Sequence, residues 1–445
     1  MPYLDLAVIA GLLATLLVGF LTRRRSPLIV SAVGTAALVA LGVAFVAEGS
    51  RWQLVAIAVS ALLVAGAVLW ARSGGSRGLA RASGVALAVV LVVLGGAAWG
   101  LPPVHVPAPG GPYAVGVAST VWVDDARDAR GGDGGEGRRS IPATIWYPAS
   151  STGDRTEYLP DRGRADELAT ALAAQYGMPP LLLDGLLRAR ANASWDAPAE
   201  EGSFPVVIAS PGTSSTRWLM TSWAEEIASR GTVVVAVDHP YDAVAAELHD
   251  GGTVRGDLTT TGDDMLDQAL ADGWARVRAA DILAVVDELT QAGDRLPALH
   301  AADPSRIVAA GHSLGGAAAV EAARLDPRIR GVVDIDGMPR SPAGTVLGRP
   351  AVFVVAGDAD PNPVYDAAVL GYLRDGAAAR LTVDGVTHLS LVDTGLLLAP
   401  VPGITGLRGP EGPRLAARAT EIVLDAVTTG TDPDSTALAA LGRVG

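Results

Sequence analysis

A serine flanked by glycines stands between two segments of different pattern. The run Gly311-His312-Ser313-Leu314-Gly315 follows the apolar stretch RIVAA and precedes the alanine-rich stretch GAAAVEAARL. This spacing predicts a tight turn from a strand into a helix, with the serine hydroxyl exposed at the end of the strand. The helix N-terminus that follows favours developing negative charge. A chance match is possible in a chain with 53 glycines, but the flanking strand and helix favour a nucleophile.

A serine needs a base to take its proton at neutral pH. His388 follows the last predicted strand in LTVDGVTHLSLVD, where the chain order serine, acid, histidine places the base of such a hydrolase. His239 ends a strand in VAVDHP, and we interpret it as a structural residue near the site. The other four histidines lie in a linker, in polar loops or beside the serine: His105, His249, His300 and His312.

An acid must orient the histidine and stabilise its charged form. Asp336 follows the strand GVVDI, and Asp360 follows the next strand in VVAGDADPNP. Both lie between the serine and the histidine, so position alone leaves the choice open. Asp334 lies within the predicted strand, and we expect it to be structural.

The tetrahedral intermediate of acyl transfer needs two backbone N–H donors for its oxyanion. Leu314 follows the nucleophile and supplies the first candidate. The second is Thr213, in the run Ser210-Pro211-Gly212-Thr213 after the strand PVVIA. An ordinary Pro-Gly turn is the alternative interpretation of that run.

Cofactor and metal motifs are absent from the sequence. No Walker loop, dinucleotide fingerprint or H-E-x-x-H helix occurs, and the D-x-D element at 358–360 is a weak metal signal. With no cysteine, disulfides, thiolate metal sites and a cysteine nucleophile are excluded. We therefore expect no cofactor and no metal.

The elements that must position these residues alternate between β-rich and helical patterns after residue 112. Such alternation predicts an α/β fold with a mostly parallel sheet covered on both faces. Segment 125–139 is expected to be a mobile surface loop, and segment 150–202 to hold helical pieces of a possible cap. Expected strands are 113–123, 141–147, 205–209, 232–237, 306–310, 331–335, 351–356 and 380–383, and expected helices 216–230, 264–292, 315–325, 364–374 and 411–427.

From IPATIWYP through PVVIASPGT, VAVDHP, GHSLGG, DIDGMP and THLSLVD, the sequence resembles the plasma-type platelet-activating factor acetylhydrolases and their bacterial relatives. The resemblance covers roughly residues 112–430 and implies an α/β-hydrolase fold. Carried onto matching positions, it implies a triad of Ser313, Asp336 and His388, with Thr213 and Leu314 as oxyanion donors.

One segment departs from that family. GDADPNP is similar to the acid loop of the broader hydrolase superfamily, which keeps Asp360 as the alternative acid. The family hydrolyses short-acyl esters, including oxidised or ether phospholipids, while bacterial relatives cleave varied esters and even polyesters. The resemblance therefore implies ester hydrolysis without fixing the substrate.

Four apolar stretches precede the enzyme part, each close to the roughly 20 residues that cross a bilayer as a helix. They carry no internal charge and are apolar all round, which favours membrane helices over soluble core helices: residues 4–21, 27–47, 52–70 and 84–101. A cleaved signal peptide would need a basic leader, and the first five residues carry Asp5 instead. We predict a four-helix membrane domain at 1–101, a Pro/Gly-rich linker at 102–112 and a hydrolase domain at 113–445.

Charge predicts the orientation and the partners. Three arginines follow the first stretch, one follows the second and three follow the third, which places the first and third loops in the cytoplasm. The hydrolase domain is then expected on the extracytoplasmic side of the cell membrane. The first 100 residues carry a net charge of +5, so the −13 of the whole chain leaves −18 for the rest. An acidic domain of this kind argues against nucleic acid as a partner.

These observations predict a membrane-anchored serine hydrolase acting on lipid-like or short-acyl esters. Two alternatives stay open: an amidase or peptidase with the same triad, and a non-catalytic hydrolase fold that serves as a binding module on a membrane sensor or transporter. The helices lack the internal charges of a substrate pathway, which argues for anchoring. Nothing in the sequence indicates a protein partner.

Overall fold

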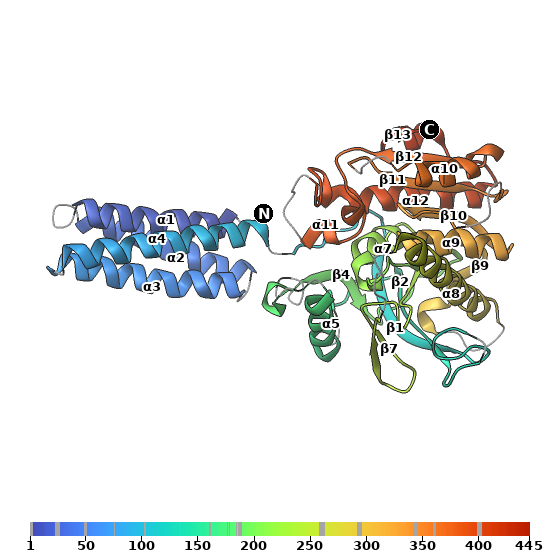
Figure 1. The fold of residues 1–445 in the computed structure, drawn as a ribbon, viewed down its shortest axis with the longest axis horizontal. Coiled ribbons are helices and arrows are strands. Elements are labelled where there is room, and N and C mark those ends of the chain that lie inside the picture. The colour runs from blue at the N-terminus through green and yellow to red at the C-terminus, as the bar shows by residue number, and fades with distance from the viewer. Residues whose placement is uncertain are drawn as a thin grey trace. The chain divides into compact units, whose positions relative to one another are not determined.

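The computed structural model spans residues 1–445. It describes all of them except 1–2, 23–26, 49–50, 75, 102–103, 133, 160–161, 176, 178, 184, 186–188, 258–262, 292–295, 341–344, 359–361 and 398–402. The chain forms two compact units (Figure 1). The first comprises Met1–Val104 with the short segments Pro179–Arg188 and Leu397–Ala399, and the second comprises the remainder.

Four long helices make up the first unit: α1 (Tyr3–Thr22), α2 (Pro27–Glu48), α3 (Trp52–Arg72) and α4 (Arg77–Gly100). Each is long and apolar enough to cross a membrane. Small and branched side chains meet inside the bundle, while large apolar side chains such as Leu62 and Val46 are exposed on its outside. The fourth helix begins at Arg77, seven residues before the apolar stretch expected at 84, because arginine and alanine are good helix formers and extend the helix past its apolar part.

The second unit is built on one large twisted sheet. Among the described residues it has eleven strands in the order β13-β12-β11-β10-β9-β5-β6-β2-β1-β4-β3. The pairs from β6 through β5, β9, β10 and β11 to β12 are parallel, and β2 joins β1 and β6 in antiparallel register. The strands are β1 (Ala114–Asp124), β2 (Arg139–Ala149), β3 (Arg155–Glu157), β4 (Arg190–Trp195), β5 (Phe204–Ser210), β6 (Val233–Val237), β9 (Ala302–His312), β10 (Ile329–Ile335), β11 (Ala351–Ala356), β12 (Ala378–Val383) and β13 (Arg443–Val444).

Helices cover both faces of this sheet (Figure 1). α8 (Asp264–Thr290) packs beside α9 (Leu314–Leu325), while α7 (Thr221–Ala228) packs beside α12 (Gly412–Thr429). The central strands are rich in Val, Ile and Ala because both faces of the sheet are covered. The predicted α/β class is confirmed.

The remaining elements are short. The hairpin β7 (Ala245–Glu247) and β8 (Thr253–Arg255) stands apart from the main sheet. Further helices are α5 (Arg162–Gln175), α10 (Pro363–Tyr372), α11 (Thr394–Leu397) and α13 (Ser435–Ala439), and 3-10 turns include η2 (Arg217–Met220) and η5 (His388–Leu391). Within the segment 150–202, β3 and β4 extend the edge of the sheet, and α5 and a 3-10 turn (Pro180–Leu183) have the helical form expected there.

The segment 125–139, expected to be a mobile surface loop, contains a loop before β2 that is held by hydrogen bonds to one carboxylate. The Asp128 carboxylate accepts four backbone N–H groups, those of Arg130, Gly132, Gly134 and Gly135. These hydrogen bonds, led by those from Gly132 and Gly135, lower the pKa of Asp128 to about 2. A glycine-rich stretch that looks unstructured is therefore folded around one carboxylate.

Candidate active site

Ser313 lies at the point where β9 turns into α9. Its backbone has φ 58° and ψ −126°, a conformation that a side chain rarely adopts. The turn is held by the Ser313 N–H, which donates to the Ile335 carbonyl at 2.9 Å. Glycine is required at 315, because a Cβ there would collide with the Ser210 carbonyl. The local sequence therefore forms the strained turn that exposes a serine hydroxyl.

His388 and Asp336 lie together although 52 positions separate them. His388 Nδ1 is 2.7 Å from Asp336 Oδ2, and the other carboxylate oxygen accepts the Ala356 N–H at 2.9 Å. The histidine side chain is 42% exposed and the aspartate 10%. Burial alone would raise the pKa of Asp336, but the hydrogen bond and charge of His388 lower it overall. An ionised carboxylate facing a half-exposed imidazole is what proton transfer from a serine requires.

His312 connects the serine turn to the histidine loop. Its ring lies 4.5 Å from that of His388 between centroids, and its Nε2 donates to the His388 carbonyl at 2.8 Å. Burial and the neighbouring imidazole lower the pKa of His312 to about 3, so this ring is neutral. His312 therefore fixes the backbone of His388 beside the turn that carries Ser313. Apart from the adjacency of His312 to the serine, no sequence pattern indicated this contact.

The other candidate acids have different positions. Asp334 lies buried beneath the first turn of α9, where its Oδ1 accepts the Gly337 N–H at 2.7 Å. Burial raises the pKa of Asp334 well above the usual range of a carboxyl group. Asp360 lies outside the described residues. The structure therefore brings Asp336 to His388 and leaves the role of Asp360 as a prediction.

The two expected oxyanion donors lie on segments that meet at the turn. Leu314 is the first residue of α9, and Thr213 lies in the loop after β5. A Cβ on Gly212 would be 3.4 Å from the Ser313 Cβ and 3.0 Å from His312 Nδ1, so this loop passes directly beside the serine. Within the described part of the chain, neither the Leu314 nor the Thr213 N–H donates to another protein group.

Strained backbone gathers at this edge of the sheet. Five described residues other than glycine have a positive φ, and Asp196 is the only one remote from the site. Ser313 and Asp336 belong to the candidate triad, Ser214 follows Thr213, and Tyr241 follows the end of β6. Such conformations cost roughly 1–3 kcal/mol each and are typical of functional sites.

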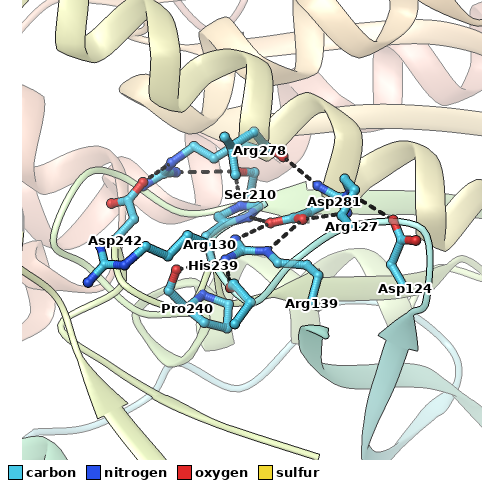
Figure 2. Close-up of polar contacts among 12 residues, drawn as sticks. Asp124, Arg127, Arg130, Arg139, Ser210, His239, Pro240, Asp242, Arg278 and Asp281 are labelled. Carbon is cyan, nitrogen blue, oxygen red and sulfur yellow. Dashed lines mark hydrogen bonds and ion pairs between the residues drawn. The ribbon is translucent and has the colours of Figure 1, made fainter. Parts of the chain in front are cut away.

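His239, expected to be structural, is completely buried behind the loop that carries Thr213. Its Nε2 is 2.8 Å from Ser210 Oγ, and its Nδ1 is 2.7 Å from Asp281 Oδ2 (Figure 2). The chain thus has a second Ser, His and Asp array, made from residues that the sequence did not single out together.

Comparison with known proteins bears on the fold and on the family. The family described as platelet-activating factor acetylhydrolase, isoform II, matches residues 100–249. A "Probable 1-alkyl-2-acetylglycerophosphocholine esterase" of Arthroderma benhamiae is 29% identical over 142 residues, which are 32% of this chain and 33% of that protein. The chain thus spans about a third of the length of this curated relative.

A solved structure extends the likeness beyond residues 100–249 to most of the chain. A ferulic acid esterase from Streptomyces cinnamoneus superposes with a TM-score of 0.60 at 25% identity, covering 77% of this chain and 96% of that chain. The fold is therefore that of an α/β-hydrolase resembling platelet-activating factor acetylhydrolase. The matched residues 100–249 include Thr213 but end before Ser313, so the arrangement of the triad rests on the geometry described above.

Proposed function

We propose that the chain is a serine hydrolase that cleaves carboxylic esters through an acyl-enzyme on Ser313. The observation that carries this proposal is the 2.7 Å contact between His388 Nδ1 and Asp336 Oδ2 at the edge where Ser313 occupies a strained turn. Two esterases support an ester as the bond that is cleaved: one is similar in sequence and the other in structure.

The proposed steps follow from the hydrogen bonding. An ionised carboxylate only accepts hydrogen bonds, so His388 Nδ1 carries a proton and donates it in the hydrogen bond to Asp336. The Nε2 atom then has a lone pair that can accept a proton from Ser313. Ser313 Oγ attacks the ester carbonyl carbon while its proton passes to His388 Nε2. The Leu314 and Thr213 N–H groups stabilise the resulting oxyanion. The alcohol then leaves with the proton from His388.

Water completes the cycle by the same route. His388 takes a proton from a water molecule, whose oxygen attacks the acyl carbon attached to Ser313. The second tetrahedral intermediate collapses, the bond from the acyl carbon to Oγ breaks, and Ser313 recovers its proton from His388. The products are a carboxylic acid and free enzyme, and no group outside the chain is needed.

The proposed substrate is a lipid-like or short-acyl ester, and the proposed location is the extracytoplasmic face of the cell membrane. The name of the curated relative, an acetylglycerophosphocholine esterase, supports a short acyl chain on a lipid. The four apolar helices support anchoring in a bilayer. Such an anchor would hold the hydrolase close to esters that partition into the membrane.

The activity is tested by labelling the full chain in membranes with a fluorophosphonate and by turnover of p-nitrophenyl acetate. We expect wild type to label, and Ser313→Ala to lose both labelling and turnover. Folded wild type that neither labels nor turns over would contradict the enzyme and favour a binding module. Turnover of p-nitroacetanilide at a rate comparable to the ester would favour the amidase alternative.

The location is tested with single cysteines, because the natural chain contains none. Ser73→Cys lies between α3 and α4, and Ser435→Cys lies in the hydrolase domain, both at exposed positions. A maleimide that cannot cross membranes should label Ser435→Cys in intact cells and label Ser73→Cys only after lysis. The reverse pattern would place the hydrolase domain in the cytoplasm.

A further inference from the structure

Arg278, a buried residue of α8, binds the loop that carries Thr213. Its Nη1 donates to the Pro211 carbonyl at 2.5 Å and its Nη2 donates to the Gly212 carbonyl at 3.1 Å. Its Nε pairs with Asp242, whose other carboxylate oxygen accepts the Ser214 N–H at 3.3 Å. The loop is thus held immediately before and immediately after Thr213.

We propose that Arg278 is a positioning residue for the oxyanion hole, and that the buried Ser210, His239 and Asp281 array holds Arg278 in place. The inference rests on the proposed function, since it requires that Thr213 N–H stabilise the oxyanion of an acyl transfer. It adds residues that act through the loop and never touch the substrate.

Peptide geometry explains how a contact on one side of the loop acts on the other. The structure has no cis peptide bond among its described residues, and in a trans peptide the C=O and N–H point in opposite directions. With the Gly212 carbonyl bound to Arg278, the N–H of Thr213 must point away from Arg278. A flipped peptide would direct a carbonyl dipole at the oxyanion and repel it. The arginine therefore favours the one orientation that stabilises negative charge.

The buried array supplies Arg278 with a directional chain of hydrogen bonds (Figure 2). Arg278 Nη1 donates to Ser210 Oγ at 3.3 Å, and Ser210 Oγ is 2.8 Å from His239 Nε2. His239 Nδ1 is 2.7 Å from the Asp281 carboxylate, which can only accept. The Nδ1 proton is thereby fixed, so Nε2 accepts from the Ser210 hydroxyl. In each of these hydrogen bonds, the donor and the acceptor are therefore determined.

The charges keep this direction constant. Burial and the nearby Arg278 lower the pKa of His239 to about 4, so the ring is neutral near pH 7. Burial alone would raise the pKa of Asp281, but its ion pair with Arg139 and the hydrogen bond from His239 lower it overall. Arg139 contacts both oxygens of Asp281, at 3.1 and 2.7 Å, and Arg127 adds an ion pair at 2.8 Å. Asp281 therefore stays ionised and keeps the imidazole in one tautomer.

A second catalytic triad is excluded by burial. Ser210, His239 and Asp281 are each at most 1% exposed, so no ester reaches the Ser210 hydroxyl. Ser210 belongs to the end of β5 and has none of the strain of Ser313. Its neighbours are the loop carbonyls and Arg278. The position of this array, directly behind Thr213, is what indicates a positioning role.

The test compares Arg278→Lys and Ser210→Ala with a matched control in the full chain. Arg349 also donates to backbone carbonyls, those of Leu347, Asp326 and Ile329, but it precedes β11 and lies at the opposite edge of the parallel sheet. Arg349→Lys is therefore the control for losing an arginine that binds carbonyls. Each variant is assayed for p-nitrophenyl acetate turnover, for inhibition by an alkyl trifluoromethyl ketone, and for thermal unfolding. The ketone forms an oxyanion on Ser313 and so reports on the hole directly.

We expect Arg278→Lys and Ser210→Ala to lower kcat by about 10- to 100-fold with KM changed less than about threefold, because removal of one oxyanion donor outright costs about 10²–10³-fold. The inhibition constant of the ketone should rise by the same factor as kcat/KM falls, whereas Arg349→Lys should change neither by more than about twofold. Folded variants that keep wild-type ketone affinity would overturn the positioning role, even if they unfold more easily. If Arg278→Lys fails to fold, Ser210→Ala decides alone. An unlabelled wild type would instead refute the proposed function.

Discussion

The molecule contains two arrays of serine, histidine and aspartate, and they differ in access and in backbone. In the Ser313 array the histidine is 42% exposed and the serine and aspartate both have positive φ. In the Ser210 array all three residues are buried and the backbone is relaxed. The histidine to aspartate distance is 2.7 Å in both. Identical residue types at identical spacing therefore do not define a catalytic centre.

The same chain of hydrogen bonds has different surroundings in the two arrays. In the exposed array the imidazole has one free nitrogen, and a proton can move. In the buried array both ring nitrogens are occupied and Arg278 donates to the serine, so no proton has a destination. In the proposed roles, exposure allows such a hydrogen-bond chain to move a proton, whereas burial makes it a rigid support. The turn that carries Ser313 also lies beside the buried array, since Gly315 packs against the Ser210 carbonyl.

Replacing aspartate by asparagine at position 336 of the exposed array and at position 281 of the buried array gives the largest predicted contrast. Asp336→Asn should lower kcat/KM for p-nitrophenyl acetate by roughly 10³–10⁴-fold, because the amide no longer holds the imidazole in the productive tautomer. Its melting temperature should change little. Asp360→Asn serves as the control and should stay within about threefold of wild type. The opposite ranking of these two variants would assign the acid to Asp360.

Asp281→Asn should lower stability, in addition to the turnover that depends on the position of Arg278. Loss of this charge leaves Arg139 and Arg127 buried beside a neutral group, and breaking a buried ion pair costs about 3–5 kcal/mol. Urea unfolding followed by tryptophan fluorescence measures the change, with the exposed Asp432→Asn as control. A free energy of unfolding equal to that of wild type would show that the ion pairs of Asp281 do not stabilise the fold.

His239 should give the hydrolase domain a pH dependence of known sign. Its pKa is about 4 when folded and about 6.5 when unfolded, so the unfolded chain binds more protons between these values. Stability is then fully present above pH 6.5 and is lost as the pH falls through 4, by about 3 kcal/mol. In His239→Asn, the difference in unfolding free energy between pH 7 and pH 4 should shrink by about that amount. An unchanged difference would mean that His239 titrates normally.

The smallest effect is expected at His312. His312→Phe keeps the ring contact with His388 but removes the hydrogen bond to its carbonyl, which is worth about 1 kcal/mol. Turnover should fall by about fivefold at every pH from 6 to 9, with labelling of Ser313 retained. A loss of more than 100-fold would indicate that His312 takes part in proton transfer itself.

Local patterns predicted the α/β fold and the strands that carry the candidate triad. Ser313, Asp336 and His388 each follow a short strand that is rich in apolar residues, so short windows of sequence contain the signal. The bounds of those strands moved by a few residues at most. Pairing of Asp336 rather than Asp360 with His388 needed either the family resemblance or the structure.

The buried array could not be predicted in the same way. Asp281 and Arg139 are 142 positions apart, and their contact depends on how β2 and α8 pack. Arg278 and Asp281 lie on one face of α8, three residues apart, which in a single sequence looks like an exposed ion pair. The only available signal was that Arg278 and Asp281 are charged, whereas the residues three and four positions away from them on α8 are mostly apolar.

The positive φ angles at Ser313 and Asp336 have a consequence for engineering. Each is a conformation that glycine would adopt without strain, so two residues that the proposed mechanism needs are poorly suited to their own backbone. Replacing Ser313 by glycine should yield an inactive protein that withstands heat better than wild type. A selection for thermal tolerance alone would therefore drift toward inactive variants, and a selection for turnover alone would accept a lower melting temperature. Useful stabilising changes must be sought away from this edge of the sheet.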